Sequence, residues 1–274
     1  LTEAGIEVEE IHGEVNPGFG GIAPEPIKKN LGELMHKVPS GHFDLGLATD
    51  GDADRVGAVD ETGAMVDAQR CFALLLQHAY EDKGWRGSVV KTFAATRMID
   101  RLAERYKLPF YKRPVGFKYV CELALQEPVL IGGEESGGLG FPAIHIPERD
   151  GILSSLLLAE MVAQRGQPLS VIIEELMRQV GKHVYDRIDL HLPPARKESL
   201  LEELESRPPR EFAELRVTDV DALDGYKFAL GDHGWILIRP SGTEPIVRVY
   251  AELDDEGLLS RVLAAGRKVA LGEA

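Results

Sequence analysis

The sequence predicts an α/β architecture with mixed sheets, followed by an α+β C-terminal domain. Three observations predict it. Between about residues 66 and 180, short apolar runs alternate with helical patterns of about 10–15 residues, which is typical of βαβ units around a mostly parallel sheet. Beyond residue 182, four strand-like runs follow one another between two helical patterns, which is typical of an α+β domain. The length of 274 residues corresponds to two or three small domains at roughly 150 residues each.

The first section, residues 1–64, contains three expected strands and one expected helix. IEVEEI at 6–11 alternates apolar and acidic residues, which favours a strand. Apolar residues recur at helical spacing over 27–38. Two short apolar runs at 44–50 and 55–61 share their ends with the hexapeptide DGDADR, which is therefore expected in a loop between two strands.

The second section, residues 66–180, begins with AQRCFALLLQHAYEDKG, which has apolar residues at helical spacing and ends at Gly84. Three β-type apolar runs follow, and each of the first two precedes a helical pattern. The third run, PVLI, leads into the glycine-rich segment GGEESGG. The strands are expected at 88–93, 109–114 and 128–131, and the helices at 68–84, 96–106, 115–125, 150–166 and 169–181.

The third section, residues 182–274, opens with a strand pattern at 183–192 and a charged helix that ends at 200–206. The strand-like runs LRVTDVDAL, YKFALG, WILIRP and PIVRVYAEL come next. DEGLLSRVLAAGRKVAL then has the pattern of a closing helix.

Composition disfavours several classes of partner. The chain carries 31 Lys and Arg against 45 Asp and Glu, a net charge of −14, which disfavours nucleic acid and anionic membranes as partners. No apolar run reaches the roughly 18 residues of a membrane span. Cys71 and Cys121 lie in apolar helical stretches, so we expect free thiols and a cytoplasmic protein.

DGDADR is the first candidate site. Asp50, Asp52 and Asp54 alternate through a tight loop, and three converging carboxylates suit a hard cation such as Mg²⁺. A calcium EF-hand loop is one alternative, because Glu61 falls at its twelfth position. However, Arg55 stands where that loop requires glycine, and the flanks are strand-like. A solvated acidic turn is the other alternative.

GGEESGG is the second candidate site. It leaves a buried-type strand at its carboxyl end, where α/β folds place ligands. Glu134 and Ser136 could hydrogen-bond the hydroxyls of a sugar. A glycine-rich turn without a ligand is an equally open interpretation.

RPSGTEP is the third candidate site, after the strand WILI. Ser241, Gly242 and Thr243 can present successive backbone N–H groups to an anion. Arg239 can add a bidentate grip on phosphate. The alternative is a Ser-Gly turn with a surface arginine.

Four further cations are candidates for a ligand site, although each by itself is more often solvated. They are Lys91, Arg97, Lys118 and Arg149.

These three motifs, in this order, resemble those of the α-D-phosphohexomutase superfamily, which includes phosphoglucomutase, phosphomannomutase and phosphoglucosamine mutase. That family carries a DGDxDR metal loop, a GExS sugar loop and an RxSGTEP phosphate loop on successive domains. The resemblance covers nearly the whole chain. It implies a partial metal-binding α/β domain over 1–64, a sugar-binding α/β domain over 66–180 and a phosphate-binding α+β domain over 182–274.

The resemblance implies a phosphoglucomutase that interconverts glucose 1-phosphate and glucose 6-phosphate through a phosphoserine and a bisphosphate. The implied cofactors are Mg²⁺ and, as activator and intermediate, glucose 1,6-bisphosphate. Asp50, Asp52 and Asp54 would hold the metal, and Arg55 would position the reacting phosphate. The implied substrate-binding residues are Glu134, Ser136, Lys91, Lys118 and Arg149 around the sugar, and Arg239, Ser241, Gly242 and Thr243 on the non-reacting phosphate.

The sequence departs from the family pattern in two places. No segment resembles the TASHNP-type motif that carries the phosphoserine, and the chain opens at Leu1. We therefore expect the C-terminal part of a longer protein, inactive alone, whose partner is its own missing N-terminal domain. Residues 115–118 read Val-Gly-Phe-Lys, where many glucose-type relatives have Thr-Gly-Trp-Lys.

Three alternatives to this function stay open. The sugar preference could be that of a phosphomannomutase or a dual-specificity mutase. The missing serine motif would suit a non-catalytic phosphosugar-binding module, and Glu61 would suit a Ca²⁺-binding interaction protein. Apolar surface exposed near residues 1–15 would allow a homodimer.

Overall fold

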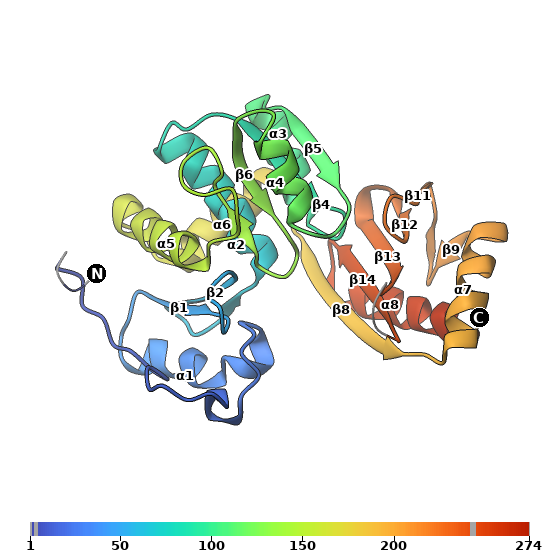
Figure 1. Ribbon diagram of the computed structural model, residues 1–274, viewed down its shortest axis with the longest axis horizontal. Coiled ribbons are helices and arrows are strands. Elements are labelled where there is room, and N and C mark those ends of the chain that lie inside the picture. The colour runs from blue at the N-terminus through green and yellow to red at the C-terminus, as the bar shows by residue number, and fades with distance from the viewer. Residues whose placement is uncertain (1, 3–4, 242–244, 274) are drawn as a thin grey trace.

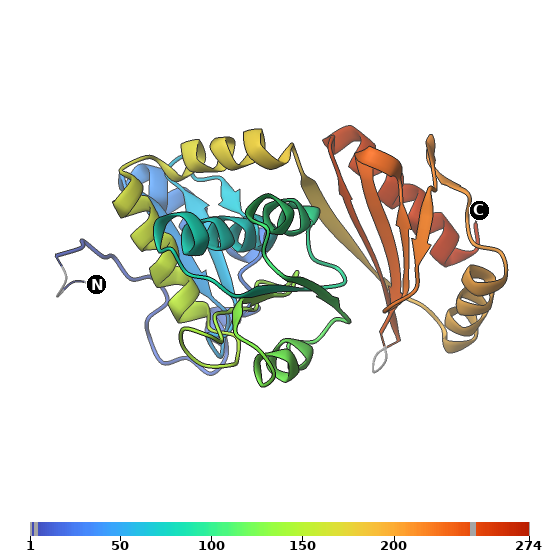
Figure 2. The ribbon, with the colours of Figure 1, turned by 90° about the horizontal axis from the view of Figure 1, so that it is seen from above.

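The computed structural model describes residues 2, 5–241 and 245–273. Three parts follow one another along the chain, each built around its own main sheet (Figure 1). The N-terminal and middle parts lie together at one end of the molecule, and the C-terminal part lies at the other (Figures 1 and 2). The strand β8 (Val184–His191) leads the chain from the middle part into the C-terminal part. The mixed α/β fold class is confirmed.

The N-terminal part is a three-stranded antiparallel sheet with one helix. β1 (Leu45–Thr49) pairs with β2 (Val56–Asp60), and β3 (Met65–Val66) pairs with the other edge of β2. DGDADR therefore spans the connection between β1 and β2, as expected. The helical segments of this part are η2 (Phe19–Gly21), η3 (Lys28–Asn30) and α1 (Gly32–Ser40).

The strand expected at 6–11 does not form. Residues 6–10 have no regular structure, and Ile6 and Val8 are 43% and 48% exposed. No strand within the described part of the chain pairs with this segment. The apolar surface expected near the N-terminus is present, because Val15 is fully exposed as well.

The middle part is a four-stranded sheet in the order β5-β4-β6-β7. β4 (Ser88–Thr92) runs parallel to β5 (Phe110–Arg113) and β6 (Val129–Gly133), whereas β7 (Leu139–Gly140) is antiparallel. β4 and β6 are buried along their whole length, as apolar strands covered on both faces should be. The helices are α2 (Ala68–Gln77), a π-helical extension (His78–Asp82), α3 (Arg97–Tyr106), α4 (Lys118–Ala124), α5 (Gly151–Arg165) and α6 (Leu169–Val180).

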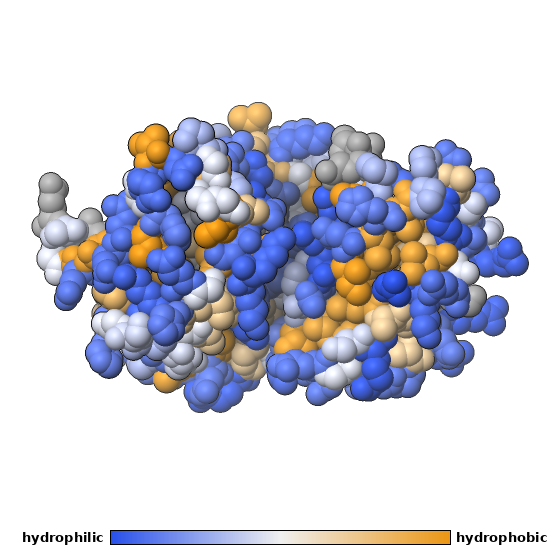
Figure 3. Space-filling view, turned by 90° about the horizontal axis from the view of Figure 1, so that it is seen from below, coloured by the Kyte–Doolittle hydropathy of each residue, from blue (hydrophilic) through white to orange (hydrophobic). Residues whose placement is uncertain are grey.

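The C-terminal part is a five-stranded antiparallel sheet in the order β11-β12-β13-β14-β8. Its alternating strands place one apolar face on the helices, which lie together on one side of the sheet (Figure 2). Seen from below, apolar side chains gather over this part of the molecule (Figure 3). Its elements besides β8 are α7 (Pro194–Ser206), β9 (Glu211–Phe212), β10 (Leu215–Arg216), β11 (Asp219–Asp221), β12 (Tyr226–Ala229), η5 (Gly231–His233), β13 (Gly234–Pro240), β14 (Ile246–Leu253) and α8 (Glu256–Leu271).

The other face of the C-terminal sheet packs against the middle part. Phe93 and Ala94, which follow β4, form a buried cluster with Trp235 and Leu237 of β13 and with Tyr250 of β14. This contact places the carboxyl end of β4 beside the C-terminal sheet. The two parts are therefore held together by apolar burial as well as by polar contacts.

Most expected elements form within a few residues of their predicted ends, but β3 extends the first sheet to residue 66, beyond the expected end of the first section at 64. Cys71 and Cys121 are free thiols, as expected. Among the described residues, no helix is both long and apolar enough to cross a membrane.

Candidate functional site

The acidic loop between β1 and β2 brings three carboxylates together. One carboxylate oxygen from each of Asp50, Asp52 and Asp54 lies within 4.8 Å of the others. Asp50 holds the loop in shape, because its Oδ1 accepts hydrogen bonds from the backbone N–H groups of Asp54 and Arg55, both at 3.0 Å. The Nε of Arg55 donates to Asp50 Oδ2. The sequence prediction that these carboxylates converge is therefore met in the geometry.

The electrostatics of this loop favour a bound cation. Burial raises the pKa of Asp54, and the neighbouring Asp50 and Asp52 raise it further, while Arg149 opposes them. Burial also acts to raise the pKa of Asp50, but the hydrogen bonds and charge of Arg55 outweigh it and leave that pKa lowered. A hard divalent cation coordinates such oxygens and would relieve the repulsion at Asp54. The donor set therefore fits Mg²⁺.

The segment GGEESGG packs directly on the acidic loop. The backbone N–H of Val56 donates to Gly137 O at 3.0 Å, and Arg55 forms an isolated β-bridge with Gly138. A side chain at Gly137 would meet the carbonyl of Val56 at 2.7 Å, and the φ of Gly137 is +95°. Only glycine can bring the backbone this close. Gly137 therefore lets GGEESGG, the predicted sugar-binding segment, pack on the acidic loop.

Arg149 joins the two loops. Its Nη2 lies 2.6 Å from Asp54 Oδ2, and its Nη1 lies 3.4 Å from Glu134 Oε2. Arg149 directly precedes the N-cap of α5, Asp150, which accepts a hydrogen bond from Leu153 N at 2.7 Å. The structure therefore brings Arg149 to the acidic loop.

Glu134 is a buried acid with an unusual titration. It follows β6 and is 6% exposed. Burial and the neighbouring Glu135 raise its pKa to about 7, although Arg149 and the backbone of Gly116 act in the opposite direction. Near neutral pH this carboxyl can either donate or accept a hydrogen bond. Ser136 lies half-buried in the same loop.

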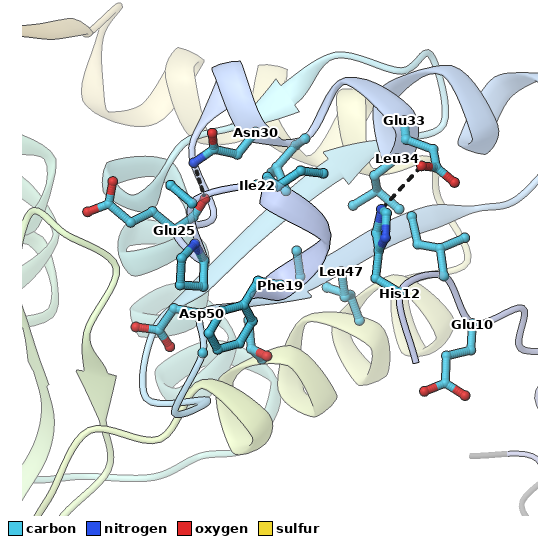
Figure 4. A pocket seen from close by; sticks show the side chains of 17 residues that line it. Glu10, His12, Phe19, Ile22, Glu25, Asn30, Glu33, Leu34, Leu47 and Asp50 are labelled. Atoms are coloured by element: carbon cyan, nitrogen blue, oxygen red, sulfur yellow. Dashed lines mark hydrogen bonds and ion pairs between the residues drawn. The ribbon is translucent and has the colours of Figure 1, made fainter. Parts of the chain in front are cut away.

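A pocket of about 410 Å³ lies within the N-terminal part, on the side of the acidic loop away from Glu134 and Arg149 (Figure 4). Phe19, Ile22 and Leu47 give it an apolar wall, and Asp50 and Glu25 lie at one end. Neither Glu134 nor Arg149 lines this pocket. The candidate site therefore lies on the face of the loop that meets the middle part.

Three predicted cations stand apart from this constellation, and Arg97 is one of them, because its guanidinium donates to the carbonyls of Gly231 and Asp232 at 3.3 and 3.0 Å. Lys91 is buried, and its Nζ donates to the carbonyls of Ala95 and Thr96, at 3.3 and 3.0 Å, and pairs with Asp100. Lys118 is exposed at the start of α4, with its Nζ 4.8 Å from the ring centre of Tyr119. A substrate role for either lysine stays a prediction.

The phosphate-loop candidates begin at the end of β13. Arg239 is half-buried, and Ser241 is 5% exposed and donates its backbone N–H to Ile246 O at 2.8 Å. Lys197 of α7 donates to the Ser241 carbonyl. Gly242 and Thr243 lie outside the described residues.

Sequence reasoning missed two carboxylates near these loops. Asp224 lies 3.0 Å from Arg239 Nε and accepts a hydrogen bond from Val115 N at 2.7 Å. Glu135 lies next to Glu134 and accepts from Thr92 Oγ1 at 3.4 Å. The Asp-Gly pair at 224–225 is a turn signal, but nothing in one sequence indicates that the turn reaches the middle part.

Comparison with known proteins gives three family matches in chain order. Residues 1–63 match phosphoglucomutase/phosphomannomutase alpha/beta/alpha domain II, and residues 67–180 match alpha/beta/alpha domain III. Residues 201–268 match the phosphoglucomutase/phosphomannomutase C-terminal domain. Together the three matches include most of the chain.

Individual relatives agree with these matches. A Thermococcus kodakarensis phosphoglucomutase/phosphomannomutase is 32% identical over 98% of this chain and 56% of its own length. A Methanococcus aeolicus phosphoglucosamine mutase is 31% identical over 98% of this chain and 59% of its own. The crystal structure of a Thermus thermophilus protein, provisionally named a phosphomannomutase, is 39% identical with a TM-score of 0.81 over 96% of this chain and 54% of that one.

The chain therefore spans a little more than half the length of the relatives it matches. The order of the three matches is the order of the three motifs. The chain belongs to the α-D-phosphohexomutase superfamily.

Proposed function

We propose that this chain forms the metal-, sugar- and phosphate-binding part of a phosphoglucomutase, which interconverts glucose 1-phosphate and glucose 6-phosphate. The observation that carries the proposal is the Arg149 bridge, which sets the acidic loop and the buried Glu134 within reach of one small ligand. The reaction would pass through a phosphoserine and a glucose 1,6-bisphosphate intermediate. Such phosphoryl transfer depends mainly on positioning and on charge neutralisation.

Asp50, Asp52 and Asp54 would hold Mg²⁺, which when bound supplies positive charge to the phosphate undergoing transfer. Asp50 already accepts hydrogen bonds from Asp54 and Arg55, and Asp54 is paired with Arg149, so Asp52 has the freer carboxylate for a metal. Arg55, 26% exposed at its side chain, would orient the same phosphate.

Glu134 and Ser136 would bind the sugar hydroxyls. The raised pKa of Glu134, about 7, lets this carboxyl serve hydroxyls that present either a donor or an acceptor. That versatility suits a reaction in which the sugar must bind in two orientations, once for each phosphate. Arg149 would keep the sugar loop and the acidic loop in register during this exchange.

Arg239, Ser241, Gly242 and Thr243 would clamp the phosphate that does not react. Arg239 ends a buried strand, so its guanidinium is presented from a rigid element. The phosphoserine would come from outside these 274 residues, since they contain no TASHNP-type motif. The chain alone should therefore bind hexose phosphates without turning them over.

A second substrate has a specific observation in its favour. The Methanococcus aeolicus relative is named a phosphoglucosamine mutase, so glucosamine phosphate is a candidate beside glucose phosphate and mannose phosphate. The paired carboxylates Glu134 and Glu135 would attract the ammonium group of an amino sugar.

The proposal is tested by calorimetric titration of the purified chain with glucose 6-phosphate, mannose 6-phosphate and glucosamine 6-phosphate in the presence of Mg²⁺. We expect binding of at least one hexose phosphate, weakened by Glu134→Gln and unaffected by the exposed control Glu214→Gln. A coupled assay with the chain alone should show no sustained mutase activity. Absence of any hexose phosphate binding, or sustained turnover, would contradict the proposal.

A further inference from the structure

Asp224 links the candidate phosphate loop to the middle part of the molecule. Its Oδ2 accepts a hydrogen bond from the backbone N–H of Val115 at 2.7 Å and lies 3.0 Å from Arg239 Nε. One carboxylate oxygen therefore contacts both the residue that begins the 115–118 loop and the arginine that begins RPSGTEP. These two residues are 124 positions apart in the sequence: Val115 lies in the connection between β5 and α4, and Arg239 lies in β13.

The loop that carries Asp224 is held against both partners. Gly225 has a φ of +90°, and a side chain there would lie 2.8 Å from Ile238 O and 3.0 Å from Arg239 Cα. The turn therefore rests on the backbone of Arg239 itself. At the other end of the loop, Asp221 pairs with Lys112 of β5. The loop thus contacts the middle part through Asp221 and through Asp224. Of these two side chains, only Asp224 also contacts Arg239 among the described residues.

The contact is an ion pair that confines the guanidinium. Arg239 and Asp224 have side chains that are 16% and 22% exposed, so water screens the pair only partly. Burial acts to lower the pKa of Arg239, but Asp224 outweighs it and leaves that pKa raised, so the arginine stays charged. The buried Nε of Arg239 has no hydrogen-bond partner among the described residues, so it is the ion pair with Asp224 that confines the planar guanidinium, whose two terminal nitrogens can grip an anion.

We propose that Asp224 is the positioning residue of the phosphate grip, and that through Val115 it makes the orientation of Arg239 depend on contact between the C-terminal and middle parts. This inference rests on the proposed function, because it takes Arg239 as a phosphate ligand. When the two parts are in contact, Arg239 is oriented for the anion. When they separate, Asp224 can no longer accept from Val115 while it contacts Arg239, so anion affinity falls. By linkage, a bound anion in turn favours the docked arrangement.

The test compares Asp224→Asn with Asp221→Asn in the purified chain. Both variants remove one charge from the same loop and one polar contact with the middle part, but only the first alters the partner of Arg239. Inorganic phosphate is the probe, titrated by calorimetry. We expect Asp224→Asn to weaken phosphate binding about tenfold, and Asp221→Asn to leave it within about twofold.

Nuclear magnetic resonance supplies a readout that needs no ligand. In the wild type, the Val115 amide should exchange slowly with water because it donates to Asp224, and the Arg239 Nε–H should do so because it is buried beside that carboxylate. Both protons should exchange faster in Asp224→Asn and should be unchanged in Asp221→Asn. Equal exchange in the two variants would overturn the proposal.

Arg239→Lys keeps the proposal falsifiable if Asp224→Asn unfolds, because it retains the charge but has no guanidinium plane to orient. It should lose phosphate affinity about tenfold, and, provided that Asp224→Asn folds, adding that change to it should cost no further affinity. A further tenfold loss in the double variant would contradict positioning through Arg239. If the wild type and Arg239→Gln bind phosphate equally poorly, the phosphate grip of the proposed function fails, and the exchange rates alone decide whether Asp224 orients Arg239.

Discussion

Arg149 Nη2 lies 2.6 Å from Asp54 Oδ2, although the two residues belong to different parts of the chain and are 95 positions apart. The same guanidinium reaches Glu134 of the GGEESGG segment at 3.4 Å. One positive charge thus sits between two carboxylates whose pKa values are both raised. The relationship connects the candidate metal site to the candidate sugar site.

Replacing Arg149 by Gln should move the pKa of Glu134 from about 7 to a higher value. The reason is that Arg149 is the charged group that now opposes the effects of burial and of Glu135. The measurement is a carbon-13 titration of the Glu134 carboxyl. Arg70→Gln is the control, because Arg70 pairs only with Asp67, at 3.5 Å, among the ion pairs of the described residues. An unchanged midpoint in Arg149→Gln would show that the bridge has no electrostatic effect on Glu134.

Hexose phosphate binding should strengthen between pH 6 and pH 8 as Glu134 ionises. Its pKa of about 7 is raised, so the carboxylate, the stronger acceptor for sugar hydroxyls, is present above that value and lost below it. Glu134→Gln should remove this component and leave only the component from the phosphate, whose second pKa is about 6. Calorimetry with glucose 6-phosphate measures both curves.

Glu135→Gln provides the matched test of that assignment. Glu135 raises the pKa of Glu134, so removing its charge should shift the inflection to lower pH without abolishing it. An inflection that stays in place in Glu135→Gln, or that persists in Glu134→Gln, would assign the pH dependence to another group.

Glu252 should stabilise the contact between the middle and C-terminal parts above pH 5. Burial of this carboxylate acts to raise its pKa. Contacts with His183 at 3.1 Å and with the backbone N–H of Arg97 at 3.0 Å outweigh that effect and lower the pKa to about 2. Its contribution is therefore present above the ordinary value of 4.5 and is lost as the pH falls toward 2. The shift corresponds to about 3 kcal/mol.

Glu252→Gln should accordingly lower the urea unfolding midpoint at pH 7, and the gap from the wild type should narrow as the pH falls from 4.5. Glu203→Gln, which removes an exposed ion pair with Arg196, is the control and should barely change the midpoint. A gap that is the same at pH 7 and at pH 3 would rule out an ionised Glu252 as its source.

Gly151→Ala should weaken Mg²⁺ binding even though Gly151 carries no ligand. A side chain at this position would lie 2.5 Å from Arg55 O and 2.8 Å from Ala53 O, so the acidic loop would have to move away from α5. Gly32→Ala is the matched control, because a side chain there meets nothing within 4 Å. Calorimetry and thermal unfolding of both variants would show whether the packing of the loop matters; equal Mg²⁺ affinity would show that it does not.

Local pattern was enough to predict most of the fold. The alternation of β4, α3, β5, α4 and β6 follows from periodicity, because each element buries its own apolar face. The segment at 6–11 has an equally regular pattern but remains irregular. A strand needs a neighbour, and pairing is a property of the whole structure that one segment does not contain.

The candidate site was predictable to the same extent. Asp50, Asp52 and Asp54 lie within five residues, so their convergence could be read from the loop itself. Lys91 has the right charge and lies near the end of an expected strand, yet it is buried against Asp100. The contacts of Asp224 could not be predicted from the sequence, because its partners, Val115 and Arg239, come together only when the C-terminal and middle parts pack against each other.

Titration of the purified chain with Mg²⁺ tests the central claim most directly, with Asp52→Asn and the exposed control Asp44→Asn measured beside it. The account predicts that the wild type and Asp44→Asn bind Mg²⁺ alike and that Asp52→Asn binds it about tenfold more weakly or not at all. Equal affinity in all three proteins, or no Mg²⁺ binding by the wild type, would contradict the assignment of the acidic loop as the metal site of a phosphohexomutase.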